Sequence, residues 1–175
     1  NNTTADDNVA IGKDALNLNT TGHSNTGIGS EALGANTTGT DNVAVGAGTL
    51  TANTTASNNT AIGAAAMNVN TTGYDNVAIG RNSLDANVGG HSNTAVGESS
   101  LTSNTTGVRN VAIGQNAMAV NTTGGENIAI GRGALDANTT ASRNTAIGDS
   151  ALGANTTAQS NLPFFCKNNF YKLTA

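Results

Sequence analysis

Tryptophan is absent from this chain of 175 residues, which also has one proline, one cysteine, 3% aromatic residues and 10% charged residues. The single Cys166 excludes an intrachain disulfide. No run of 18 apolar residues is present, so the sequence contains no segment typical of a transmembrane helix. The two histidines, His23 and His91, are too few for a metal site, and no basic patch is available for binding nucleic acid.

Three residue types dominate the composition instead, with 28 Asn, 27 Thr and 22 Gly. These residues form helices poorly, so an α-rich fold is not expected. The net charge of −4 and the single proline are also unlike a disordered chain, which usually has a high net charge and much proline. Because the chain begins at Asn1, we expect it to be a processed or excised segment.

An internal repeat of 17 residues organises the chain. Asn recurs at this interval, and the consensus of the units is N-[VT]-A-[IV]-G-x-x-[AS]-[LM]-x-x-N-T-T-G-x-x. The Asn residues that open the units are Asn8, Asn25, Asn42, Asn59, Asn76, Asn93, Asn110, Asn127, Asn144 and Asn161. We therefore divide the chain into a lead-in (1–7), nine complete units (8–160) and a C-terminal segment (161–175). Units of constant length are typical of proteins whose repeats stack identically.

Two aliphatic positions recur in every unit, and they predict the core. Position 4 is always β-branched, which favours a pleated strand, and position 9 is Leu or Met. We expect two short strands per unit, N-x-A-I-G and A-L-x-x-N. The predicted core residues are Ile11, Ile28, Val45, Ile62, Ile79, Val96, Ile113, Ile130 and Ile147 at position 4, and Leu16, Leu33, Leu50, Met67, Leu84, Leu101, Met118, Leu135 and Leu152 at position 9.

Two polar or small positions are predicted to shape the turns. A Gly at position 5 suggests a backbone angle or a close approach that a Cβ would block, and stacked Asn side chains at position 12 can form an amide ladder. The residues are Gly12, Gly29, Gly46, Gly63, Gly80, Gly97, Gly114, Gly131 and Gly148, and Asn19, Asn36, Asn53, Asn70, Asn87, Asn104, Asn121, Asn138 and Asn155. The Asn-Thr-Thr turns are also formal N-glycosylation sequons.

These patterns predict an all-β protein, a parallel β-solenoid with one coil per unit. Seventeen residues interrupted by Gly and Thr-Thr-Gly are too short for two packed helices. At a rise of about 4.8 Å per coil, nine coils give a rod roughly 43 Å long. The core of one coil is thin, so we expect further burial against neighbouring chains, with the Val/Thr alternation at position 2 marking a face between subunits.

The units resemble the head repeat of YadA-like trimeric autotransporter adhesins, most closely in N-V-A-I-G-x-x-A-L segments such as 8–16 and 76–84. They are also similar to arrays in phage tail fibres and bacterial surface proteins. The resemblance covers residues 8–160, although the unit here is longer by its N-T-T-G turn. It implies a left-handed β-roll, three chains side by side, and a role in attachment.

The C-terminal segment departs from the repeat at Pro163. It contains an aromatic group that we expect to cap the solenoid end or to dock a further module, since open ends of a solenoid need covering. The cap residues are Phe164, Phe165, Phe170 and Tyr171. A remnant without structural purpose is the alternative.

The sequence contains no catalytic constellation, and we expect neither an enzyme nor a cofactor or metal site. The predicted function is that of a structural or adhesive rod or head segment in an extracellular fibre on a cell or virion. Its expected partners are further copies, most simply in a homotrimer, and an unknown surface receptor, but neither nucleic acid nor a membrane. One alternative is an extracellular filament subunit that stacks head to tail, and a minor one is an ice-binding solenoid.

Overall fold

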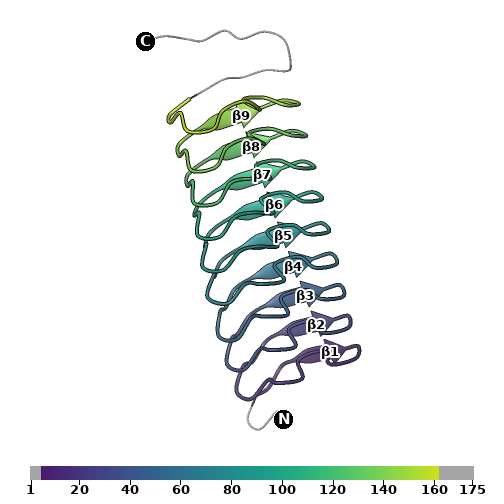
Figure 1. Ribbon diagram of the computed structural model, residues 1–175. Coiled ribbons are helices and arrows are strands. Elements are labelled where there is room, and N and C mark those ends of the chain that lie inside the picture. The colour runs from purple at the N-terminus through teal and green to yellow at the C-terminus, as the bar shows by residue number, and fades with distance from the viewer. Residues whose placement is uncertain (1–4, 162–175) are drawn as a thin grey trace.

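A computed structural model describes residues 5–161 of the chain as a stack of coils, each contributing one strand to a single parallel sheet (Figure 1). The sheet follows the chain order from β1 to β9 without a crossover. The strands are β1 (Val9–Ile11), β2 (Thr26–Ile28), β3 (Val43–Val45), β4 (Thr60–Ile62), β5 (Val77–Ile79), β6 (Thr94–Val96), β7 (Val111–Ile113), β8 (Ile128–Ile130) and β9 (Thr145–Ile147). The fold is thus the expected all-β solenoid with a 17-residue coil.

The register of the sheet equals the period of the sequence. Each residue pairs with the residue 17 positions later, as Ala78 does with Ala95. Equivalent side chains therefore form straight columns along the rod. Residues before the first complete unit follow the same geometry. The Ser24 amide donates a hydrogen bond to the Asp6 carbonyl, and one coil later the Asp41 amide donates to the His23 carbonyl in the same way.

The core is a narrow column of small and medium-sized side chains. The middle residue of each strand from β2 onwards, Ala or Gly27, points inward and is buried. It packs with the Leu and Met side chains of position 9 and the small residues of position 8. Position 9 is buried from Leu16 to Leu135, and Leu152 packs partly buried against it.

The position 4 column is the main correction to the predicted core. Its side chains lie on the outer face of the sheet, half-buried or exposed, because only the middle residue of a three-residue strand points inward. The expectation that these residues belong to the core is therefore wrong for the single chain. The residues are Ile11, Ile28, Val45, Ile62, Ile79, Val96, Ile113, Ile130 and Ile147.

The second predicted strand is also absent from the described part of the chain. The segment A-L-x-x-N instead forms part of a turn. Position 9 within the segment and position 7 just before it have positive φ angles, such as 53° at Leu84 and 55° at Asn82. A strand requires negative φ throughout, so the expected second strand cannot form in this segment.

Two columns of buried Asn close the coils. At position 12, Asn36 Nδ2 donates to Asn19 Oδ1 in the preceding coil (2.9 Å) and to the Gly39 carbonyl (3.0 Å), which ties the N-T-T-G turn together. At position 1, Asn42 Nδ2 donates to Asn25 Oδ1 (3.1 Å). Every buried side-chain nitrogen and oxygen in the described residues has a hydrogen-bond partner.

Glycine at position 5 allows adjacent coils to approach. Gly80 has a φ of 131°, and a Cβ at this residue would lie 2.6 Å from the carbonyl carbon of Gly97. An L-amino acid with a side chain would therefore be both strained and in collision with the next coil. The predicted cap residues Phe164, Phe165, Phe170 and Tyr171 lie outside the described part of the chain.

Candidate functional site

The outer face of the sheet carries a continuous apolar strip, which we call the aliphatic stripe. It consists of the first and last residues of every strand, positions 2 and 4. Position 4 is always Ile or Val, whereas position 2 is Val, Ile or Thr. Isolated apolar residues are common on protein surfaces, but a contiguous patch that runs through nine coils is typical of an interaction surface.

A row of exposed residues lies before the strands, which we call the leading rim. One Asn separates each of these residues from its strand, and each has a positive φ and is exposed to solvent. The leading rim comprises Asp7, Ser24, Asp41, Asn58, Asp75, Ser92, Arg109, Glu126 and Arg143.

A second row, the trailing rim, lies after the strands. One Gly separates each of its residues from the strand, and seven of the nine are exposed to solvent. The trailing rim comprises Lys13, Ser30, Ala47, Ala64, Arg81, Glu98, Gln115, Arg132 and Asp149. The aliphatic stripe is therefore bordered at each end of its strands by a row of mainly polar residues, a common arrangement of protein interfaces.

Ion pairs run along each rim from one coil to the next. On the trailing rim Arg81 pairs with Glu98, and Arg132 Nε lies 2.8 Å from Asp149 Oδ1. On the leading rim Arg109 Nη1 lies 3.6 Å from Glu126 Oε1. None of the ion pairs found among the described residues connects the two rims.

The N-T-T-G turns present a different surface, made mainly of Thr. The first Thr donates its hydroxyl to the backbone of the next coil, as Thr122 Oγ1 does to the Thr139 carbonyl (3.0 Å). The second Thr is exposed, as at Thr123. The Asn of the formal sequon is buried and hydrogen-bonded in most coils, so a glycan cannot be attached there without opening the coil.

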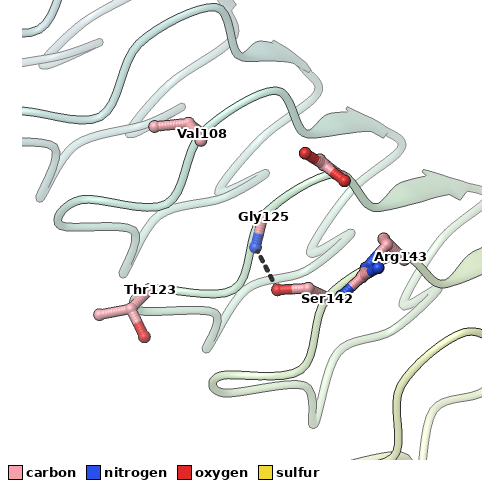
Figure 2. A pocket seen from close by; sticks show the side chains of 6 residues that line it. Val108, Thr123, Gly125, Ser142 and Arg143 are labelled. Carbon is pink, nitrogen blue, oxygen red and sulfur yellow. Dashed lines mark hydrogen bonds between the residues drawn. The ribbon is translucent and has the colours of Figure 1, made fainter.

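The turn position before the leading rim varies most in size. Tyr74 and His91 occupy it in adjacent coils and stack, with ring centroids 4.6 Å apart and an interplanar angle of 7°. Gly125 occupies the same position further along, and an open hollow lies beside it (Figure 2). Its lining includes Val108, Thr123 and Ser142, whose Oγ accepts a hydrogen bond from the Gly125 amide at 3.0 Å.

Glu126 and Arg143 of the leading rim complete the lining of this hollow. The other lining residues, Val108, Thr123, Gly125 and Ser142, have no charged side chain. In residues 5–161, no three His, Cys, Asp or Glu side chains are placed to hold a metal ion. A search of the same residues found no helix long and apolar enough to span a membrane.

Sequence reasoning identified the Asn column of position 12 but missed the ladder at position 1. The signal was present, because position 1 is Asn in all ten occurrences from Asn8 to Asn161. The rims were also missed, since their residue types vary from coil to coil. The rims border a candidate interface only because the side chains of the aliphatic stripe point outward. The sequence pattern alone did not indicate that direction.

Comparison with known proteins gives no match to a family model, a curated protein or a solved structure. The class of the protein is therefore defined by its own fold, a parallel β-solenoid of 17-residue coils with an apolar outer sheet face.

Proposed function

We propose that the chain is a structural and adhesive rod or head segment of an extracellular fibre, in which three copies pack side by side. The observation that carries the proposal is the aliphatic stripe, which follows the whole described length of the rod. The copies contact one another through this stripe and leave the Thr-rich turns facing outward.

The physical support is the amount of apolar surface that one chain leaves in water. Val9, Ile11, Ile62, Ile79, Ile113 and Ile128 are among its exposed large hydrophobic residues, and all six lie on the stripe. Complete burial of such a side chain contributes about 1.5–3 kcal/mol. A partner of the same length that repeats the same stripe covers this surface most completely.

The likeness of the N-V-A-I-G units to the head repeat of trimeric adhesins supports the finer features of the proposal. These are three copies, a left-handed roll, and attachment to a surface. Attachment by such a rod is multivalent, because equivalent turn residues recur in every coil of every copy. Weak contacts that engage together gain strength through their effective concentration.

The first test is the state of association of the full chain, measured by sedimentation equilibrium over a wide concentration range. We expect a trimer. The Val77→Ser/Ile79→Ser variant removes apolar surface from β5, and we expect it to dissociate at higher concentrations than the natural chain. Val69→Ser/Val88→Ser is the matched control. These two valines are 42% and 44% exposed, close to the 38% of Ile79, but they lie on the turns and not on the stripe.

A chain that stays monomeric at every concentration would contradict the assembly. Unlimited filaments in electron micrographs would favour head-to-tail stacking instead. Attachment is tested by retention of the natural chain on immobilised glycans and extracellular-matrix proteins, compared with the dissociated variant. We expect retention to fall when the copies separate, and equal retention would exclude the multivalent mechanism.

A further inference from the structure

We propose that the charges of the two rims fix the alignment of neighbouring copies, so that the leading rim of one copy meets the trailing rim of the next in the same layer. A layer here is one strand with the rim residue on either side. This inference rests on the proposed side-by-side assembly and adds the direction and register of its chains.

The evidence is the sign of the charges in each layer. Wherever both rims of a layer are charged, the two charges are opposite. These four layers contain Asp7 with Lys13, Asp75 with Arg81, Glu126 with Arg132, and Arg143 with Asp149. In the other five layers at least one rim residue is neutral, so no layer sets like charges against each other.

These layer pairs do not form within one chain. Their members are six residues apart with an extended strand between them, a span of up to about 20 Å. The ion pairs of the chain run along each rim instead, as between Arg132 and Asp149. Such pairs account for the alternation of charge within a rim. They place no constraint on how the signs of one rim match those of the other.

Asp75 shows this most clearly, because it has no ion-pair partner among the described residues of its own chain. It is exposed and lies in the central layer, opposite in sign to Arg81. When the aliphatic stripes of parallel copies face a common axis, the strand start of one copy adjoins the strand end of its neighbour. The carboxylate of Asp75 then faces the guanidinium of the neighbour's Arg81.

Slipped arrangements lose this complementarity. A slip of one coil in one direction creates three like-charged pairs, namely Asp75 with Glu98, Arg109 with Arg132, and Glu126 with Asp149. A slip in the other direction sets Arg143 against Arg132 and leaves Arg109 with Glu98 as the one opposite pair. Exposed ion pairs contribute little stability, but the difference between attraction and repulsion selects one alignment.

The central layer also distinguishes parallel from antiparallel copies. In a fully overlapping antiparallel pair, the fifth layer meets itself. Asp75 would then face a second Asp75, and Arg81 a second Arg81. Parallel packing replaces both repulsions with attractions, so the rims favour parallel chains.

Cross-linking of the full chain tests the alignment directly. All variants include Cys166→Ser, which removes the one native thiol. Asp75→Cys/Arg81→Cys is oxidised to form disulfides, which require the two Cα atoms to lie within about 7 Å of each other, and the products are analysed on a non-reducing denaturing gel. The slipped control is Asp75→Cys/Glu98→Cys, and Asp75→Cys alone reports antiparallel pairing. Sedimentation of each variant before the reaction shows whether it is assembled.

We expect the in-register variant to form covalent multimers at least roughly tenfold faster than both controls, because the two thiols are held at a high effective concentration. A ladder that ends at three chains indicates a ring of three, and one that ends at two indicates a face-to-face pair. Faster reaction of the slipped control, or dimers from Asp75→Cys alone, would overturn the inferred alignment.

Equal rates in assembled variants would likewise overturn the alignment but leave the proposed assembly intact. A natural chain that sediments only as a monomer would instead overturn the proposed assembly and the alignment that rests on it. Charge reversal gives a second measurement. Asp75→Arg and Arg81→Asp should each weaken association, and the double variant should recover it.

Discussion

Two files of aliphatic side chains, an inner and an outer one, run the length of the rod, and they differ in how far they are buried. The Leu and Met of position 9 lie inside, whereas the Ile and Val of position 4 lie outside. In one coil, Leu84 is 0% exposed and Ile79 is 38% exposed. The inner file holds the coil together, and the outer file is available for a partner. The comparison teaches that a regular aliphatic column in a solenoid does not by itself mark the core.

The largest expected effect comes from truncation of the inner file. Leu84→Ala should lower the free energy of unfolding by about 2–5 kcal/mol, because it leaves a cavity in a fully buried column. Ile79→Ala should cost less than about 1 kcal/mol in dilute, monomeric chains, since its side chain is already partly in water. Urea unfolding followed by circular dichroism measures both.

Val69→Ala serves as the control for this pair, as an exposed aliphatic residue on a turn. It should change the unfolding free energy and the association very little. If Ile79→Ala destabilised the monomeric chain as much as Leu84→Ala, the two files would not differ in the way described.

The sequence predicted the period, the parallel register and the inner Leu/Met file, because a repeat without insertions forces equivalent residues such as Ala78 and Ala95 into one column. It did not predict which face of the strand holds Ile. Both Ala and β-branched residues suit a strand, and the choice depends on how much space the buried Asn columns and Leu leave inside the coil. The turn at Leu84 could not be predicted from the sequence either, since a positive φ is unusual for Leu.

The close contact between coils at position 5 should be the next most sensitive feature. Gly80→Ala should cost about 2–4 kcal/mol, from an unfavourable φ and from collision with the Gly97 backbone. Gly73→Ala is the matched control. Its site is also crowded, but Ala56 and Ala141 occupy the same column, so the backbone accommodates a methyl group there.

Thermal unfolding of the two glycine variants separates these cases. A clearly lower midpoint for Gly80→Ala than for Gly73→Ala is expected. Equal midpoints would show that the coils can separate at position 5 as easily as at position 15.

The Asn ladder next to the sheet should follow in magnitude. Asn76 Nδ2 donates to Asn59 Oδ1 (3.2 Å) and to the Gly90 carbonyl (2.9 Å). Asn76→Ala should therefore cost about 1–3 kcal/mol, because it leaves buried polar groups without partners. Asn68→Ala, on a half-buried turn position, should be nearly neutral. Denaturant unfolding that ranked these two variants in the opposite order would mean that the ladder does not stabilise the inner column.

The smallest effect concerns Asp85, a half-buried turn residue that belongs to neither file. Burial raises the pKa of this carboxyl above its ordinary value of 3.8 by removing water from the charged form. The folded chain therefore holds this proton to a higher pH than the unfolded chain does. Its contribution to stability is complete below the unfolded pKa and is lost as pH rises through the folded pKa.

Asp85→Asn should remove this loss. The variant should therefore be slightly more stable than the natural protein at neutral pH, and this advantage should disappear at pH 3. Urea midpoints of both chains across this range provide the measurement, and identical pH profiles would show that burial of Asp85 has no energetic consequence.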